Sequence, residues 1–238
     1  MFKAKELRSF DAYAEKYDAW FMENKNLFSS EAAVVAWFLK PEERILSVGC
    51  GSGLFEDALR KDYNIDIREG IEPSEAMADI ARKRGMEVTI ETAEEADFGE
   101  DTYDTLLFNG TPGYIDDLQK AFRKAAKALK PGGKIVVIDV PKESSFAILY
   151  NLGKTIGNWG DDVFKGVKPD AVYPIEFVKE ARWRTTAEKV ELLEKTGFGD
   201  FEYAQTLTHH PLYANEFIEN PIEGYQKGDY VAIKGIKK

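Results

Sequence analysis

Short apolar runs alternate with amphipathic stretches from residue 44 to residue 234. Such alternation is typical of α/β proteins, in which helices cover both faces of a mainly parallel sheet. The segment between the last two runs is too short for a crossover helix, so we expect the final strand to run antiparallel to its neighbours. The runs predict seven strands, over 44–48, 67–71, 87–90, 103–108, 134–140, 201–207 and 230–234.

Helical spacing of apolar residues fills several gaps between these strands. Leu118 and Phe122 fall on one face of a segment that ends at a Pro-Gly-Gly turn. Ser74 is an N-cap candidate for another helix, and Thr185 with Glu188 has the spacing of a capping box. Helices are therefore expected over 74–84, 116–130 and 185–197.

Two further regions extend this α/β core. Phe10, Tyr13, Tyr17 and Phe21 recur at helical spacing and predict N-terminal helices with an aromatic stripe. The segment 141–183 is long and mixes glycine, proline and aromatic residues, which favours a lid over a pocket.

Composition narrows the partners and the location. The 238-residue chain has a formal net charge of −10, which opposes binding to a phosphate backbone, so we expect no nucleic-acid partner. It contains one cysteine and two histidines without metal-ligand spacing, so we expect no metal site. No run approaches the ~18 apolar residues of a membrane span, and no targeting signal is recognisable, which favours a cytoplasmic protein.

A glycine-rich turn follows the first predicted strand. Gly49, Gly51 and Gly53 alternate with Cys50 and Ser52 before a helical segment begins. Glycine lets a ligand approach the backbone closely, and the free amides of a helix N-terminus attract an anionic group. The turn predicts a ligand site, which would suit a carboxylate or a pyrophosphate equally.

An acidic residue follows the second predicted strand. Glu72 precedes Pro73 and lies about 20 residues after the glycine turn, the spacing of nucleotide-binding folds in which a carboxylate binds a ribose diol. Because parallel strands end at one edge of the sheet, Glu72 and the glycines should meet there. A ribose-containing ligand is therefore predicted.

Four segments then occur in a specific order, VGCGSG, GIEPSEAMADIARKRG, TAEEADFGEDTYDTLLFNG and ALKPGGKIVVIDV, in a match that spans roughly residues 43–140. This series resembles that of class I S-adenosylmethionine-dependent methyltransferases of the small-molecule type, and looks most similar to the ubiquinone and menaquinone biosynthesis methyltransferases. The resemblance implies an α/β, Rossmann-like fold, S-adenosyl-L-methionine as cofactor, S-adenosyl-L-homocysteine as product, and a small-molecule methyl acceptor.

The resemblance also assigns residues to the cofactor. Ser47 stands where the family usually has an acidic residue, which could weaken the grip on the methionyl amine. The implied contacts are Gly49, Cys50, Gly51 and Gly53 at the methionyl part, Glu72 and Pro73 at the ribose, Ala93 and Glu94 beside the adenine, Asn109 and Gly110 beside the sulfonium, and Tyr17 over the cofactor.

The whole chain is expected to form one methyltransferase domain. Its predicted parts are an N-terminal helical cap (1–40), a cofactor-binding core (41–140), the lid insertion (141–183), and a C-terminal helix with the last two strands (184–238).

Candidates for a catalytic base are few. His209 and His210 follow the sixth predicted strand and should emerge on the cofactor edge of the sheet, where a histidine could take a proton from the acceptor. Tyr114, after the fourth strand, is a rival. The alternative is that the histidine pair is simply exposed to solvent. An enzyme without a base is also possible, because methyl transfer depends chiefly on alignment of the reactants.

Two other functions fit the same pattern. A protein that binds S-adenosylmethionine and regulates without turnover would keep the glycine turn and Glu72. A nicotinamide-dependent oxidoreductase would also use a glycine turn, but its third glycine normally stands one position later. The sequence identifies neither the acceptor nor the oligomeric state.

Overall fold

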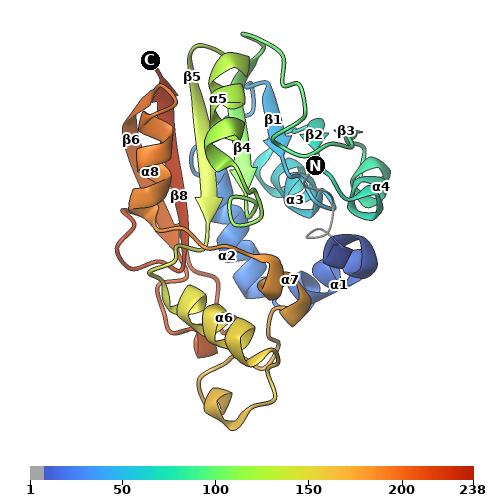
Figure 1. Cartoon of the computed structure of the whole chain (residues 1–238), viewed down its shortest axis with the longest axis vertical. Helices are drawn as coiled ribbons and strands as arrows, with labels where there is room; N and C mark the ends of the chain where they lie inside the picture. The colour runs from blue at the N-terminus through green and yellow to red at the C-terminus, as the bar shows by residue number, and fades with distance from the viewer. Residues whose placement is uncertain (1–7) are drawn as a thin grey trace.

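The computed structural model describes residues 8–238, and within this range eight strands form one sheet in the order β3-β2-β1-β4-β5-β8-β6-β7. β1 to β5 are parallel, and β8 is antiparallel to both β5 and β6 (Figure 1). The strands are β1 (Ile45–Val48), β2 (Glu69–Ile71), β3 (Glu87–Thr89), β4 (Tyr103–Asn109), β5 (Leu129–Asp139), β6 (Phe198–Thr206), β7 (Ile222–Glu223) and β8 (Tyr230–Lys237).

The predicted Rossmann-like class and the antiparallel last strand are confirmed. The expectation of seven strands is wrong by one, because β7 adds a two-residue edge strand that pairs with β6. Two residues are too few to produce the alternation by which a strand is recognised in a sequence.

Helices cover both faces of the sheet. α5 (Leu118–Ala128) and α8 (Thr186–Glu194) lie on one face, and α2 (Lys25–Ala36) and α3 (Leu54–Tyr63) lie on the other (Figure 1). The remaining elements are α1 (Arg8–Glu23), α4 (Glu75–Lys83), α6 (Ser145–Ile156), α7 (Ile175–Glu180), and the single turns η1 (Asp162–Phe164) and η2 (Pro211–Tyr213).

The core is built from the two-residue period of the central strands. In β4, Leu106 and Phe108 pack against α5, whereas Leu107 packs into the cluster on the opposite face. All three side chains are fully buried. A strand with helices on both faces must be apolar at successive positions, which explains its continuous apolar run.

The segment predicted as a helix over 116–130 is shorter in the structure. α5 begins at Leu118, where the Asp117 side chain caps the amide of Lys120, and it ends at Ala128. Leu129 already belongs to β5, because it pairs with Tyr103 of β4. Tertiary pairing therefore takes the last two residues from the helix.

The carboxyl ends of the parallel strands are covered by a layer made of α1, α6 and α7 (Figure 1). α6 and α7 belong to the long segment after β5 that the sequence indicates as an insertion. In α1 the expected aromatic stripe is partly wrong, since Tyr13 has non-helical angles (φ −132°, ψ 27°) and is exposed beside Lys16. This kink turns Tyr13 outward, while Phe10 and Phe21 stay buried. Among the residues described, no helix is long and apolar enough to cross a membrane.

Candidate active site

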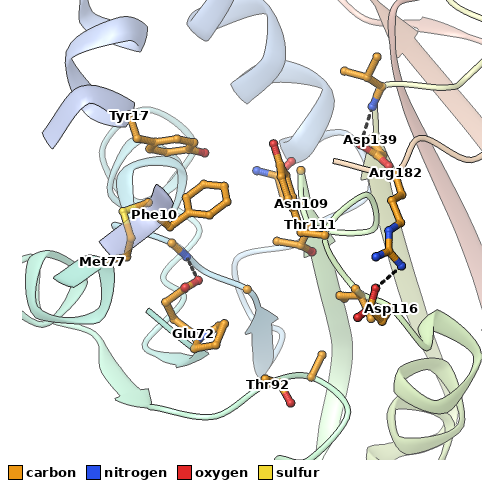
Figure 2. A pocket seen from close by; sticks show the side chains of 18 of the residues that line it. Phe10, Tyr17, Glu72, Met77, Thr92, Asn109, Thr111, Asp116, Asp139 and Arg182 are labelled. Atoms are coloured by element: carbon orange, nitrogen blue, oxygen red, sulfur yellow. Dashed lines mark hydrogen bonds and ion pairs between the residues drawn. The ribbon is translucent and has the colours of Figure 1, made fainter. Parts of the chain in front are cut away.

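A cavity of about 880 Å³ lies at the carboxyl edge of the sheet, beneath α1 and the segment after β5. The glycine turn and the ends of β2 and β4 form one wall, and side chains from α1, α2, α6 and β8 form the other. Figure 2 shows Glu72, Asn109 and Thr111 on the sheet side, with Phe10 and Tyr17 of α1 opposite them. This is the edge at which open α/β sheets bind their ligands.

The first glycine of the turn has no room for a side chain. Gly49 adopts a left-handed φ of +73°, and a Cβ there would lie 2.3 Å from Cγ2 of Thr111. Its amide donates to the carbonyl of Ile71 at 2.7 Å, which ties the turn to the end of β2. Gly49 and Gly51 both line the cavity, so backbone rather than side chain faces the ligand there.

Glu72 is held in place by two backbone amides. Gly51 donates to its Oε2 and Ser74 donates to its Oε1, each at 2.9 Å. Burial raises the pKa of Glu72 to about 7, although these two bonds act in the opposite direction. Each carboxylate oxygen has a second lone pair, so the group can still accept the two hydroxyls of a ribose. These features fit the cofactor that the sequence predicts.

The other predicted cofactor residues divide into two groups. Tyr17, Pro73, Ala93, Glu94, Asn109 and Gly110 line the cavity. Cys50 and Gly53 do not line it: Cys50 packs its Sγ against Gly70, and Gly53 is the left-handed N-cap of α3. These two residues stabilise the shape of the turn and do not face the cavity.

Ser47, the departure from the family pattern, lies beside a carboxylate. Its hydroxyl donates to Oε1 of Glu56 in α3 at 2.6 Å, and both side chains are buried. Burial raises the pKa of Glu56. Ser47 is thus bonded to an acidic side chain of α3, although neither residue lines the cavity.

His209 and His210 lie outside the cavity. Both are exposed: Nδ1 of His209 lies 3.1 Å from Glu219, and Nδ1 of His210 accepts from the amide of Leu212. They do follow β6 at the predicted edge of the sheet. However, the segment after them packs on α2, where Asn215 accepts from the amide of Asn26.

Tyr114 lines the cavity, as expected for a residue after β4. Burial raises the pKa of Tyr114 well above its usual value, and its hydroxyl is hydrogen-bonded to Tyr173. A phenol in this environment keeps its proton near neutral pH, so Tyr114 is a hydrogen-bond donor and not a base.

The half of the cavity away from Glu72 is lined by aromatic rings from separate elements, which we call the aromatic chamber. Tyr230 connects it to the sheet edge, since its hydroxyl donates to Oδ1 of Asn109 at 2.8 Å. Its rings are Tyr17, Trp20, Tyr150, Tyr173, Trp183 and Tyr230.

Two carboxylates in this chamber were not predicted as site residues from the sequence. Asp139 ends β5, and Glu31 lies in the middle of α2. A signal for Glu31 exists, because it stands on the apolar face of α2, four residues after Leu27 and four before Val35, which are both buried. A charged residue on an apolar helix face marks either a buried interaction or a site.

A sheet of this order, a glycine turn after β1 and an acidic residue after β2 define a Rossmann-like enzyme that binds a nucleoside cofactor. The chain belongs to the methyltransferase domain family, whose model matches residues 17–213.

Similar proteins match almost the whole of this chain. An uncharacterized protein of Methanocaldococcus jannaschii is 31% identical over 228 residues, which are 96% of this chain and 98% of the relative. A Thermotoga maritima structure, described as a SAM-dependent methyltransferase and possible histamine N-methyltransferase, is 33% identical with a TM-score of 0.83, and the match covers 98% of this chain and all of that one (100%). Phosphoethanolamine N-methyltransferase 2 of Haemonchus contortus, solved with S-adenosyl-L-methionine, shares the fold at 17% identity, with a TM-score of 0.64 over 99% of this chain and 60% of that chain.

The protein is therefore an S-adenosylmethionine-dependent methyltransferase, and the predicted enzyme class and cofactor are confirmed. The family assignment removes the nicotinamide-dependent oxidoreductase from consideration. The closer resemblance to the ubiquinone and menaquinone enzymes stays a prediction.

Proposed function

We propose that this enzyme methylates a small molecule held in the aromatic chamber, with S-adenosylmethionine bound against the glycine turn and Glu72. The observation that carries the proposal is that both regions line one continuous cavity. When bound, S-adenosylmethionine supplies an electrophilic methyl group on a positively charged sulfur. Residues of this chain would bind the cofactor, orient the acceptor and exclude water.

Cofactor binding is assigned to residues that the structure already holds in position. Glu72 would accept the ribose hydroxyls, since two backbone amides fix its carboxylate. The backbone of Gly49 and Gly51 would lie against the methionyl part, and Ala93 with Glu94 would border the adenine. The Glu94 side chain accepts from the amides of Asp116 and Asp117 at 3.0 and 3.2 Å, which stabilises that loop.

The aromatic chamber would position the acceptor and exclude water. Its rings pack against one another. The ring centres of Tyr150 and Tyr173 lie 5.9 Å apart, and those of Trp20 and Tyr173 lie 4.9 Å apart. Alignment of reactants in such a site accounts for ~7–11 kcal/mol in well-oriented systems, which is more than a general base supplies. Tyr114 would contribute by holding Tyr173. His209 and His210 lie too far outside to be given a role.

Binding of S-adenosylhomocysteine to ligand-free protein tests the cofactor assignment. We expect Glu72→Gln to weaken binding by about 1.5–3 kcal/mol, the range for a hydrogen bond to a charged group. Isothermal titration calorimetry measures the effect. Glu191→Gln is the matched control, because Glu191 is an exposed carboxylate on α8 paired with Lys195. Absence of binding to the unmodified protein, or equal affinity in Glu72→Gln, would contradict the assignment.

A further inference from the structure

Glu31 is a buried carboxylate without a partner. Its side chain faces the cavity from α2, and the residue is only 7% exposed. Within residues 8–238, no group donates a hydrogen bond to the Glu31 carboxylate and no cation forms an ion pair with it. A charged group in this position loses most of its hydration and gains nothing from the protein in return, which is costly unless a ligand supplies the missing partner.

Aromatic side chains from four separate elements surround this carboxylate. Tyr17 of α1, Tyr150 of α6, Tyr173 before α7 and Tyr230 of β8 are all close enough for the charge of Glu31 to raise their pKa values. All four also line the cavity. A ring face carries partial negative charge and attracts a cation within about 6 Å of its centre. Carboxylate and rings therefore favour the same kind of ligand.

The second carboxylate of the chamber is different. Oδ2 of Asp139 lies 3.9 Å from Nζ of Lys189, and both side chains are fully buried. Lys189 thus offsets the charge of Asp139, whereas no cation among the described residues lowers the pKa of Glu31, which burial raises to about 8. Among the described residues, Glu31 is thus a buried carboxyl of the chamber with no cation to offset its charge when it ionises.

We propose that the acceptor is an amine, and that Glu31 binds it as the ammonium ion among the tyrosine rings and then takes its proton. This inference rests on the proposed function, since it assumes that the aromatic chamber holds the acceptor. It makes Glu31 the residue that selects the substrate class.

The proton is transferred between two groups that both lie in the chamber. An N–H bond of the ammonium breaks, its electron pair stays on nitrogen, and the proton forms an O–H bond with the Glu31 carboxylate. The resulting neutral amine has the lone pair that methyl transfer requires, and the neutral acid is the form that burial favours. Tyr230, bonded to Asn109, places this step next to the sheet edge assigned to the sulfonium.

Proton release on cation binding tests the inference without relying on activity. The protein is first saturated with S-adenosylhomocysteine, then titrated near pH 7 with choline, which has a quaternary nitrogen and no proton to give, in two buffers of different ionisation enthalpy. Because a buried acid with its pKa near 8 is mainly protonated at this pH, choline binding should release about one proton per site. Glu31→Gln should release none and should bind choline at least about tenfold more weakly.

The neutral isostere 3,3-dimethyl-1-butanol separates charge from shape. We expect it to bind the unmodified protein at least about tenfold more weakly than choline, and to bind Glu31→Gln unchanged. Methyl transfer to phenethylamine should be lost in Glu31→Gln, and 2-phenylethanol should not be methylated by either protein. Glu191→Gln should behave as the unmodified protein in every assay.

Tyr150 provides a second, independent variant that keeps the carboxylate. Tyr150→Leu removes a ring face and should weaken choline binding about three- to thirtyfold, whereas Tyr150→Phe should bind choline normally. This pair keeps the inference testable even where Glu31→Gln folds poorly.

Equal binding of choline and its isostere, or proton release that persists in Glu31→Gln, would overturn the inference. It would also be overturned if Glu31→Gln lost affinity for S-adenosylhomocysteine, because Glu31 would then face the cofactor. Failure of the unmodified protein to bind S-adenosylhomocysteine is a separate result, which would contradict the proposed function itself.

Discussion

At the scale of single residues, the three buried carboxylates that line the cavity differ in what surrounds them. Glu72 accepts two backbone amides, Asp139 lies near Lys189, and Glu31 has neither. A carboxylate fixed by amides is suited to a neutral diol, whereas an uncompensated one is suited to a cation. The same residue type thus occupies two different environments in one cavity.

The stability of the ligand-free protein should report on Glu31. Its pKa is raised from 4.5 to about 8, so the unfolded state ionises first as the pH rises. The contribution of this group to the free energy of unfolding therefore falls between pH 4.5 and about 8 and is constant above that range. Relative to the unmodified protein, Glu31→Gln should gain on the order of 3–5 kcal/mol over this interval.

Chemical denaturation of both proteins at several pH values measures this difference. Glu191→Gln should follow the unmodified protein at every pH, since that carboxylate is exposed on α8. Parallel curves for Glu31→Gln and the unmodified protein would show that Glu31 is not held in a costly environment.

At the scale of elements, the segment after β5 is tied to the chamber by Trp159. Its ring packs on Gly153 of α6, where a Cβ would lie 2.5 Å from the indole. Its Nε1 donates to the carbonyl of Tyr173 at 2.9 Å. Because Tyr173 lines the chamber, this hydrogen bond fixes part of the chamber wall.

Trp159→Phe should therefore affect the acceptor and not the cofactor. Loss of one such hydrogen bond is worth about 0.5–1.5 kcal/mol, which corresponds to a roughly three- to tenfold increase in KM for the acceptor. Affinity for S-adenosylhomocysteine should stay unchanged. Steady-state kinetics and calorimetry measure the two effects, with the exposed Trp37 replaced by Phe as control. A loss confined to cofactor affinity would contradict this role of the segment.

At the scale of the whole molecule, the cavity joins parts of the chain that are far apart in sequence, from Phe10 in α1 to Tyr230 in β8. Its walls exist only when the sheet, α2 and the segment after β5 have assembled. Ligand binding is therefore coupled to global folding and should shift the unfolding transition as a unit.

Thermal unfolding with S-adenosylhomocysteine tests this coupling. A ligand at 100 times its Kd stabilises the folded state by about 2.7 kcal/mol, which for a chain of this size raises Tm by about 5–11 °C. In Glu72→Gln the shift at the same ligand concentration should be smaller. An unchanged Tm for the unmodified protein, despite saturation in calorimetry, would show that the site and the fold are not coupled.

Part of the site was predictable because it is local. Gly49, Gly51 and Glu72 follow successive parallel strands, so the order of elements alone brings them together. Tyr13 was predicted wrongly because the kink of α1 breaks the helical period on which the prediction relied. His209 and His210 were placed at the correct edge, but the loop that carries them turns away and packs on α2, where the amide of Glu219 donates to Ser30.

The layered α/β fold, the antiparallel last strand and the meeting of the glycine turn with Glu72 at one edge of the sheet could be predicted from the sequence. Each of these depends on periodicity or on short spacings along the chain. The aromatic chamber became visible only in the tertiary structure. Glu31, Tyr150 and Tyr230 come from three distant elements, and only their packing places a carboxylate without a counterion among aromatic rings. No local pattern encodes such an environment, because burial and charge balance are properties of the assembled core.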